Sequence, residues 1–350
     1  MKYTKYSGGG RPCIWHRIDP DHRLSTSAEY IESQTVGETQ PVTWTVRRIL
    51  AWMAEDFAGR GIVSPRLDAD LLVCHALGQD RVRLYMDLDR PLDEAELAAI
   101  RGRVARRRRR EPVAYIVGQK EFYLRAFEVS PAVLVPRPET ELLVDRALQR
   151  LGELQAARDA GAPLRVLDLC TGSGAIAVTL AAERPGLALD ATDMSAEALA
   201  TARRNAERHG VAERVRFFEG DLFEALESGD RYALIAANPP YVGESERDAL
   251  EPEVRDHEPP LALFSGADGL VLLRRLCATV AERLEPGGVL LFEVGAGQAA
   301  TVCELLERDG RLCEVRSHRD LAGHERLVEA RRRSLSKPSA TASAANARKM

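Results

Sequence analysis

The chain has 350 residues, of which 45% are hydrophobic and 29% are charged, and its formal net charge is −4. This composition is typical of a globular protein of about two domains. The small net charge argues against bulk nucleic-acid binding and against attraction to a membrane surface. No apolar run is long enough to span a bilayer. The cysteines are scattered without a C-x-x-C pair, which argues against a disulfide framework or a zinc site and fits a reducing cytoplasm.

The N-terminal part of the chain separates into two segments of different composition. Residues 1–40 are polar, rich in Gly, Ser and Thr, and without periodicity, so we expect a disordered extension with no assigned function. In residues 41–110, apolar side chains such as Val46, Met53 and Phe57 recur at helical spacing. We expect a small all-α domain here. It carries no catalytic constellation of its own, and docking a substrate suits it better than chemistry.

A second helix of this segment is expected to begin at Ser64 and Pro65, which supply an N-cap and a first-turn proline. Leu67, Leu71 and His75 share one face of that helix. We therefore expect His75 to be a packed core residue rather than a ligand.

A further helix is expected to open near Asp93 and to end in the arginine run Arg106–Arg110. Cations are favoured at a helix C-terminus, so the run is interpreted as a solvated face. A contact with RNA or with an acidic partner is the less favoured alternative.

Residues 111–137 are expected to form a β-hairpin linker, because they contain two short β-rich runs, Phe122–Val129 and Val133–Val135. The stretch Pro136–Glu141 then leads into an apolar helix, one element before the sheet, where its charged residues are placed to border a cofactor pocket. The catalytic domain is expected over 138–330. Residues 331–350 are basic and rich in Ser and Ala, so a disordered tail is predicted there.

The sheet is expected to start with a strand–loop–helix unit. Leu164–Cys170 is predicted to be a strand, Thr171–Gly174 a tight glycine loop, and the residues from Ala175 onward a helix. Because glycine lacks a Cβ and allows positive φ, a ligand can approach the backbone N–H groups of such a loop closely. The loop has neither the G-x-G-x-x-G fingerprint nor the lysine of a P-loop.

Three later strands are expected to end in polar residues. The second ends at Asp193, where a carboxylate can hold ribose hydroxyls. The third, Val215–Phe218, is followed by Asp221, which can border an adenine. The fourth, Tyr232–Ala237, stops at Asn238-Pro-Pro-Tyr241, because two prolines cannot continue a central strand. Carboxyl ends of parallel strands are where open α/β sheets bind ligands.

The loop after the fourth strand suits the activation of an amide. An amide or ring-amine nitrogen is a poor nucleophile, because its lone pair is delocalised. The Asn238 side-chain oxygen and the Pro239 carbonyl can bind both hydrogens of one NH2 group, aim its lone pair at an electrophile and favour the developing positive charge. Tyr241 can cover the flat face of that group. An ordinary Pro-Pro turn explains the tetrapeptide alone equally well, so the context decides.

In this order, the glycine loop, Asp193, Asp221 and the Asn-Pro-Pro-Tyr loop resemble the class I S-adenosylmethionine-dependent methyltransferases. The resemblance implies an α/β fold, with a Rossmann-like sheet after the small all-α domain, and S-adenosylmethionine as cofactor. Further motifs narrow it to the PrmC/HemK family of peptide chain release factor N5-glutamine methyltransferases, from about Val42 to about Arg331. These motifs include Glu111-Pro-Val-Ala-Tyr-Ile-Val-Gly118, Val135-Pro-Arg-Pro-Glu-Thr-Glu141, Glu293-Val-Gly295 and Asp320-Leu-Ala-Gly323.

The family resemblance implies methylation of the glutamine in the Gly-Gly-Gln motif of class-1 release factors. We expect a cytoplasmic monomer that needs no metal, no membrane and no nucleic acid. The catalytic positions implied are Asn238 and Pro239. The positions implied for the glutamine are Asn238, Pro239, Pro240, Tyr241 and Phe122. The positions implied for the cofactor are Cys170, Thr171, Gly172, Ser173, Gly174, Asp193, Asp221, Leu222 and Asn238. Cys170 stands where many methyltransferases have a glycine.

Three alternatives stay open at this point. A sister enzyme that methylates a ribosomal-protein glutamine resembles the family elsewhere, but Pro138-Glu-Thr140 favours the release-factor enzyme. An adenine-N6 DNA methyltransferase uses the same kind of four-residue motif to bind an exocyclic NH2, yet it would need a target-recognition region. A non-enzymatic RNA or ribosome adaptor would use the arginine-rich helix, and its RNA binding would be salt-sensitive.

The remaining chain is expected to complete the sheet. Pro259 and Pro260 are predicted to shape a loop over the site. The later elements expected are a helix over Leu270–Leu284, a strand over Val289–Val294, a helix near Gln298–Arg308 and a hairpin of Cys313–His318 with Arg326–Glu329.

Overall fold

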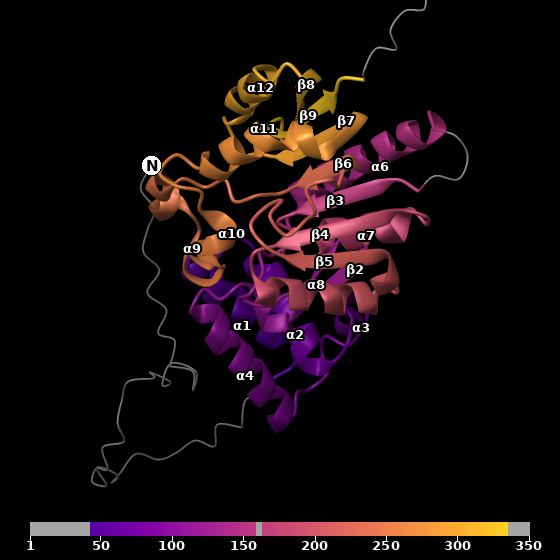
Figure 1. Ribbon diagram of the computed structural model, residues 1–350. Helices are drawn as coiled ribbons and strands as arrows, with labels where there is room; N and C mark the ends of the chain where they lie inside the picture. The colour runs from indigo at the N-terminus through magenta and orange to yellow at the C-terminus, as the bar shows by residue number, and fades with distance from the viewer. Residues whose placement is uncertain (1–42, 159–162, 335–350) are drawn as a thin grey trace, which may run out of the picture. The chain divides into compact units, whose positions relative to one another are not determined.

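The computed structural model describes residues 43–158 and 163–334 (Figure 1). The extension predicted for residues 1–40, and the predicted tail from residue 335 onward, lie outside the described residues. Within the two described stretches, no helix is long and apolar enough to cross a membrane.

Helices dominate the first part of the described chain. Side chains cap three of them, since Thr45, Asp80 and Asp93 each accept a hydrogen bond from a backbone N–H of the first turn. The apolar residues of the first helix are buried at the predicted spacing. The helices are α1 (Val46–Gly59), α2 (Pro65–Leu77), α3 (Arg81–Met86), α4 (Glu94–Arg108) and α5 (Val113–Val117).

The inward face of α2 differs from the predicted one. Leu67 and Leu71 are 44% and 37% exposed, and His75 is exposed as well, so the prediction of a packed core histidine is wrong. Asp68 and Asp70 are buried on this helix instead, and each pairs with an arginine. The apolar spacing therefore predicted the wrong buried face of α2, because the face that carries the two paired carboxylates is the buried one.

The arginine run at the end of α4 is not the predicted solvated face. Arg107 is 4% exposed and donates hydrogen bonds to Asp68 at 2.8 Å and to Glu253 at 2.6 Å. Arg110 donates to the second oxygen of Glu253 at 2.6 Å. Glu253 belongs to α9 (Pro252–His257), which follows the Asn-Pro-Pro-Tyr loop. The run therefore ties α2 and α4 to a segment next to the predicted site.

A small hairpin follows the helices. β1 (Gln119–Phe122) and β2 (Arg125–Glu128) pair antiparallel as a separate sheet, within the segment predicted for a hairpin linker. Val133–Val135, the second β-rich run, is a loop rather than a strand. Val133 is buried, and its carbonyl accepts a hydrogen bond from the Tyr115 hydroxyl at 2.6 Å. That bond satisfies a buried backbone group without a neighbouring strand.

A seven-stranded sheet forms the larger part of the fold, in the order β5-β4-β3-β6-β7-β9-β8. The strands from β5 to β7 in this order run parallel, whereas β9 is antiparallel to both β7 and β8. The strands are β3 (Arg165–Leu169), β4 (Ala188–Asp193), β5 (Val215–Glu219), β6 (Tyr232–Ala237), β7 (Leu284–Glu293), β8 (Leu312–Arg319) and β9 (Glu325–Arg332). β9 thus extends into the stretch from residue 331 that was predicted to be a tail.

Helices cover both faces of this sheet (Figure 1). Neighbouring residues of a strand enter opposite cores, as Leu234 and Ile235 do. One core contains residues of α6 (Glu141–Ala156), α7 (Ala175–Glu183) and α8 (Ala196–Arg208), and the other contains residues of α11 (Val271–Arg283) and α12 (Ala299–Glu307). A mostly parallel sheet buried on both faces, preceded by helices, confirms the predicted Rossmann-like α/β class.

β3 is the switch point of the sheet, because β4 and β5 lie on one side of it and β6 and β7 on the other. Loops that leave the strands on the two sides of such a point diverge and open a crevice at the carboxyl edge. In the parallel register Ala237 of β6 pairs with Phe292 of β7. Asn238 and Glu293, the next residues, therefore leave the sheet beside each other.

Candidate active site

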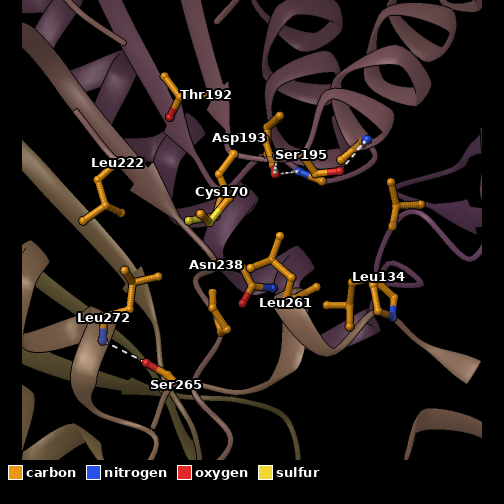
Figure 2. Close-up of a pocket in the computed structure, with 18 of the residues that line it drawn as sticks. Leu134, Cys170, Thr192, Asp193, Ser195, Leu222, Asn238, Leu261, Ser265 and Leu272 are labelled. Atoms are coloured by element: carbon orange, nitrogen blue, oxygen red, sulfur yellow. Dashed lines mark hydrogen bonds between the residues drawn. The ribbon is translucent and has the colours of Figure 1, made fainter. Parts of the chain in front are cut away.

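A cavity of about 340 Å³ lies at this carboxyl edge. It is within the size range of small-molecule sites and occupies the place where α/β sheets bind ligands. Figure 2 shows Cys170, Asp193 and Asn238, which follow or end three neighbouring strands, around one hollow. The short helix α10 (Pro260–Leu263) contributes Leu261 to its wall, as expected for a loop shaped by two prolines.

The glycine loop after β3 divides into residues that line the cavity and one that packs behind it. Cys170 and Gly172 have φ of 58° and 55°, and both line the cavity. A Cβ on Gly172 would have no heavy atom within 4 Å. Gly174 has φ of 80°, and a Cβ there would lie 3.1 Å from the Cβ of Ala202 on α8. Gly172 therefore leaves room for a ligand, whereas Gly174 allows close packing of α7 on α8.

Two carboxylates border the cavity at the ends of β4 and β5. Asp193 accepts hydrogen bonds from the backbone N–H groups of Gly172 and Ser195, each at 2.9 Å. Burial raises the pKa of Asp193 above its ordinary value, although these bonds oppose the shift. Asp221 accepts a hydrogen bond from Arg275 at 2.8 Å, and both residues line the cavity. Backbone N–H groups thus hold Asp193 in place, and Arg275 of the helix Val271–Arg283 holds Asp221.

Asn238 stands at the end of β6 and lines the same cavity. Its Nδ2 donates to the Thr140 hydroxyl at 3.1 Å. No group in residues 43–158 or 163–334 donates a hydrogen bond to the Asn238 side-chain oxygen or to the Pro239 carbonyl. Pro240 also lines the cavity. The loop therefore presents two acceptors without partners inside the described structure.

The other three residues predicted for the substrate site, Pro239, Tyr241 and Phe122, are not among the residues that line this cavity. Tyr241 is held from behind, since its hydroxyl donates to Glu293 at 3.3 Å and its carbonyl accepts from Gln298 at 2.8 Å. Phe122 is only 1% exposed and packs edge-on against Phe127, with ring centroids 6.0 Å apart. The structure places Phe122 in the hydrophobic core rather than in the wall of the cavity.

Several lining residues were missed by sequence reasoning. Leu134 and Leu261 supply apolar wall, Thr140 contacts Asn238, and Arg275 holds Asp221. Leu134 lies in the run misread as a strand. Thr140 lies in the stretch Pro136–Glu141, and the position of that stretch just before the sheet indicated that it borders the cavity. Arg275 is one of several arginines on α11, and no local pattern distinguishes it.

The described residues fit S-adenosylmethionine. Gly172 leaves an open approach to the backbone, and Asp193 ends β4 with a half-buried carboxylate fixed by two N–H groups. Asp193 also places a carboxylate in the cavity wall, whereas the charge of Asp221 is balanced there by Arg275. This fold and this site define the class I S-adenosylmethionine-dependent methyltransferases.

The comparisons with known proteins identify the family within that class. Residues 48–118 match the PrmC N-terminal domain, and residues 144–253 match the methyltransferase small domain. The chain is similar to release factor glutamine methyltransferases from Geobacter sulfurreducens and Nitratidesulfovibrio vulgaris. The first is 45% identical over 83% of this chain and 98% of the relative, and the second 43% identical over 82% and 95%. A relative of the same name from Bordetella pertussis is 45% identical over 75% of this chain and 93% of its own length. The chain belongs to the release factor glutamine methyltransferase family.

Proposed function

We propose that this protein transfers a methyl group from S-adenosylmethionine to the side-chain amide nitrogen of the glutamine in the Gly-Gly-Gln motif of class-1 peptide chain release factors. The observation that carries the proposal is a pair of acceptors at the end of β6, the side-chain oxygen of Asn238, which lines the cavity, and the carbonyl of the next residue, Pro239. Neither accepts a hydrogen bond from the described residues. The relatives are matched over nearly their whole length, and their names support the choice of substrate. Because release factors act on ribosomes, we place the reaction in the cytoplasm.

S-adenosylmethionine, when bound, supplies the electrophilic methyl group on its sulfonium. Asn238 and Pro239 each accept one hydrogen of the glutamine NH2, so that the nitrogen lone pair points away from both acceptors. Their dipoles also favour the positive charge that develops on the nitrogen. Pro240, which lines the cavity, is proposed to contact the planar amide, and Tyr241 is proposed to support the loop from behind. As the N–C bond forms, the S–C bond would break with its electron pair remaining on sulfur, and the methylated amide would release one N–H proton to solvent. Catalysis then rests on positioning and on fixed dipoles, and no strong general base is required.

Cofactor binding is proposed to use three of the strand ends. Asp193 is placed to hold the ribose hydroxyls, and Asp221 and Leu222 to border the adenine. The loop Cys170–Ser173 is proposed to pass along the rest of the cofactor, since each of its residues lines the cavity. Gly174 is proposed to act indirectly, through the close packing of α7.

Residues 41–110 are proposed to be a docking domain for the release factor, joined by a linker over 111–137 to the catalytic domain over 138–330. A glutamine side chain offers little contact area, so a second surface must distinguish the right protein. The Arg107 and Arg110 bonds to Glu253 fix this segment against α9, close to the catalytic loop. The same bonds occupy two of the cations that an RNA adaptor would need, which supports a protein that needs no nucleic acid. A monomer remains the proposed oligomeric state.

Mass spectrometry of a purified release factor, incubated with this protein and S-adenosylmethionine, tests the proposal. The expected product is a single added methyl group on the glutamine of the Gly-Gly-Gln tryptic peptide. A ribosomal-protein fraction and an adenine-containing DNA duplex, incubated in parallel, test the two enzyme alternatives. Methylation of either one in place of the release factor would overturn the proposed substrate.

A further inference from the structure

A buried carboxylate stands behind the Asn-Pro-Pro-Tyr loop and takes no direct part in the proposed chemistry. Glu293 ends β7, and its side chain is 2% exposed. Its two oxygens have different partners, since Oε2 accepts from the Thr140 hydroxyl at 2.7 Å and Oε1 accepts from the Tyr241 hydroxyl at 3.3 Å. The Thr140 oxygen in turn accepts from Asn238 Nδ2 at 3.1 Å. A continuous chain of bonds therefore connects Glu293 to both ends of the loop.

The direction of each bond in this chain follows from the donors available. A carboxylate has no hydrogen to give, so the single hydrogen of the Thr140 hydroxyl must point at Glu293. With its hydrogen committed, Thr140 can only accept from the side chain on its other flank. Asn238 must therefore turn its NH2 group toward Thr140 and its oxygen away from it. The opposite orientation would place two acceptors, the Asn238 oxygen and the Thr140 oxygen, against each other.

We propose that Glu293 and Thr140 are positioning residues that fix the side-chain amide of Asn238 in the one orientation in which its oxygen receives the substrate NH2. Tyr241 is fixed by the same carboxylate, so one buried charge sets both flanks of the Asn-Pro-Pro-Tyr loop. The inference rests on the proposed function for its effect on turnover. The orientation of Asn238 itself is independent of the substrate and can be observed without it.

The surroundings of Glu293 make this orientation sensitive to pH. Burial raises the pKa of Glu293 to about 7, against the opposing effects of the bonds from Thr140 and Tyr241 and of nearby Arg326. Glu139, on the short helix before α6, acts in the same direction as burial. When protonated, Glu293 can donate to Thr140, which can then donate to Asn238 and turn its amide over. Turnover should therefore fall as the pH falls through about 7 and reach its plateau above that value.

Side-chain amide NMR reads the orientation directly. The chain has three asparagines, Asn205, Asn238 and Asn346, so selective 15N-asparagine labelling gives few NH2 signals to assign. In the wild-type protein at pH 8 one Asn238 NH2 proton should exchange slowly with solvent. Thr140→Val, which removes the hydroxyl with little change of shape, should abolish this protection, whereas Thr140→Ser should keep it. Asn205 is fully buried and serves as the internal reference for folding.

Steady-state kinetics with a release factor as substrate provide the second test of the proposal. Thr140→Val and Glu293→Gln should each lower kcat by roughly 10- to 100-fold, as removal of supporting hydrogen bonds commonly does, with KM and the calorimetric Kd for S-adenosylmethionine little changed. Both variants should also lose the fall in kcat below pH 7, and Thr140→Ser should retain it. The inference would be overturned if the wild-type protein is active and Thr140→Val has the same kcat. It would also be overturned if the kcat of Thr140→Ser falls as far as that of Thr140→Val. If the wild-type protein were inactive on release factors, the proposed function would be refuted instead. The NMR result alone would then decide whether the orientation of Asn238 is as proposed.

Discussion

The helical region and the catalytic sheet differ in the kind of side chains that they bury. Every residue of β6, Tyr232–Ala237, is buried, and each face of the sheet packs against apolar helices. In α4 the buried residues are Ile100, Val104 and the charged Arg107. Apolar packing is nondirectional and spread over many side chains, whereas a buried ion pair depends on a few groups. The site therefore rests on an apolar frame, while α2 and α4 are tied to α9 through a small number of buried charges.

This difference locates the vulnerable contacts of the molecule. Glu253 of α9 receives hydrogen bonds from both Arg107 and Arg110, and Glu258, just after α9, accepts from Arg137 at 2.5 Å. The segment between the Asn-Pro-Pro-Tyr loop and α11 is thus held at two acidic positions. A substitution at either arginine cluster should disturb the attachment of this segment without changing the sheet.

Loss of the Arg107 side chain should have the largest effect on stability. Arg107→Ala leaves Asp68 and part of Glu253 buried without a partner, and breaking a buried pair in this way costs about 3–5 kcal/mol. Denaturant unfolding, followed by the tryptophans Trp44 and Trp52 near the helical region, measures the loss. Arg47→Ala is the matched control, because the Arg47–Asp89 pair is exposed and should contribute little to stability. Equal losses in the two variants would contradict the comparison.

The catalytic edge should lose activity without losing stability. Asn238→Ala removes one of the two proposed acceptors and should lower kcat by about 10²–10³-fold, the usual consequence of removing one group that stabilises developing charge. The free energy of unfolding and the Kd for S-adenosylmethionine should stay close to the wild-type values. A methyl-transfer assay with radiolabelled cofactor, together with calorimetry, measures both. Near-normal turnover would refute the proposed role of Asn238.

The strand ends were predictable from the sequence, because apolar runs of the right length stop at polar residues and the parallel topology brings those ends together. Asp193, Asp221 and Asn238 all border the cavity for this reason. Contacts between distant parts of the chain were not predictable. Arg107 and Glu253 are 146 residues apart, and Thr140 and Glu293 are 153 apart, so no local pattern connects either pair.

Short elements were the other source of error. Phe122 ends a strand of four residues, and its place in the substrate site was inferred from the family resemblance rather than from the pattern of that strand. The resemblance placed its ring in the substrate pocket, whereas packing against Phe127 places it in the core. On α2 the apolar spacing of Leu67 and Leu71 was real, but it marks an exposed face.

A smaller effect is expected at the proposed ribose site. Asp193→Ala should weaken S-adenosylmethionine binding by roughly 1.5–3 kcal/mol for each charge-assisted hydrogen bond lost. Calorimetric titration measures this, and kcat at saturating cofactor should change much less than in Asn238→Ala. Asp221→Asn, which keeps a polar group beside Arg275, gives a milder comparison. An unchanged Kd in Asp193→Ala would show that the ribose is bound elsewhere.

The smallest effect, and the sharpest separation of the two regions, should come from the exposed apolar face of the helical region. Val82 and Met86, one turn apart on α3, are 72% and 80% exposed. On the neighbouring α2, Leu67 and Leu71 are also exposed, and the Tyr85 hydroxyl links the two helices by donating to Asp70 at 2.7 Å. Large apolar side chains that are exposed together mark surfaces that bind other proteins.

We therefore expect the double substitution Val82→Ser, Met86→Ser to raise KM for an intact release factor several-fold, since most single contacts at an interface contribute about 1 kcal/mol or less. A short Gly-Gly-Gln peptide is expected to be a poor substrate, because it lacks the docking partner. The kcat at saturation, the Kd for S-adenosylmethionine and the turnover of that peptide should not change, because none of these depends on docking. Leu124→Ser is the matched control, since Leu124 is 93% exposed in the turn between β1 and β2, outside the helical region. If the control raised KM as much as the double variant, or if the double variant lost activity on the peptide as well, the exposed face of α2 and α3 would not be the docking surface.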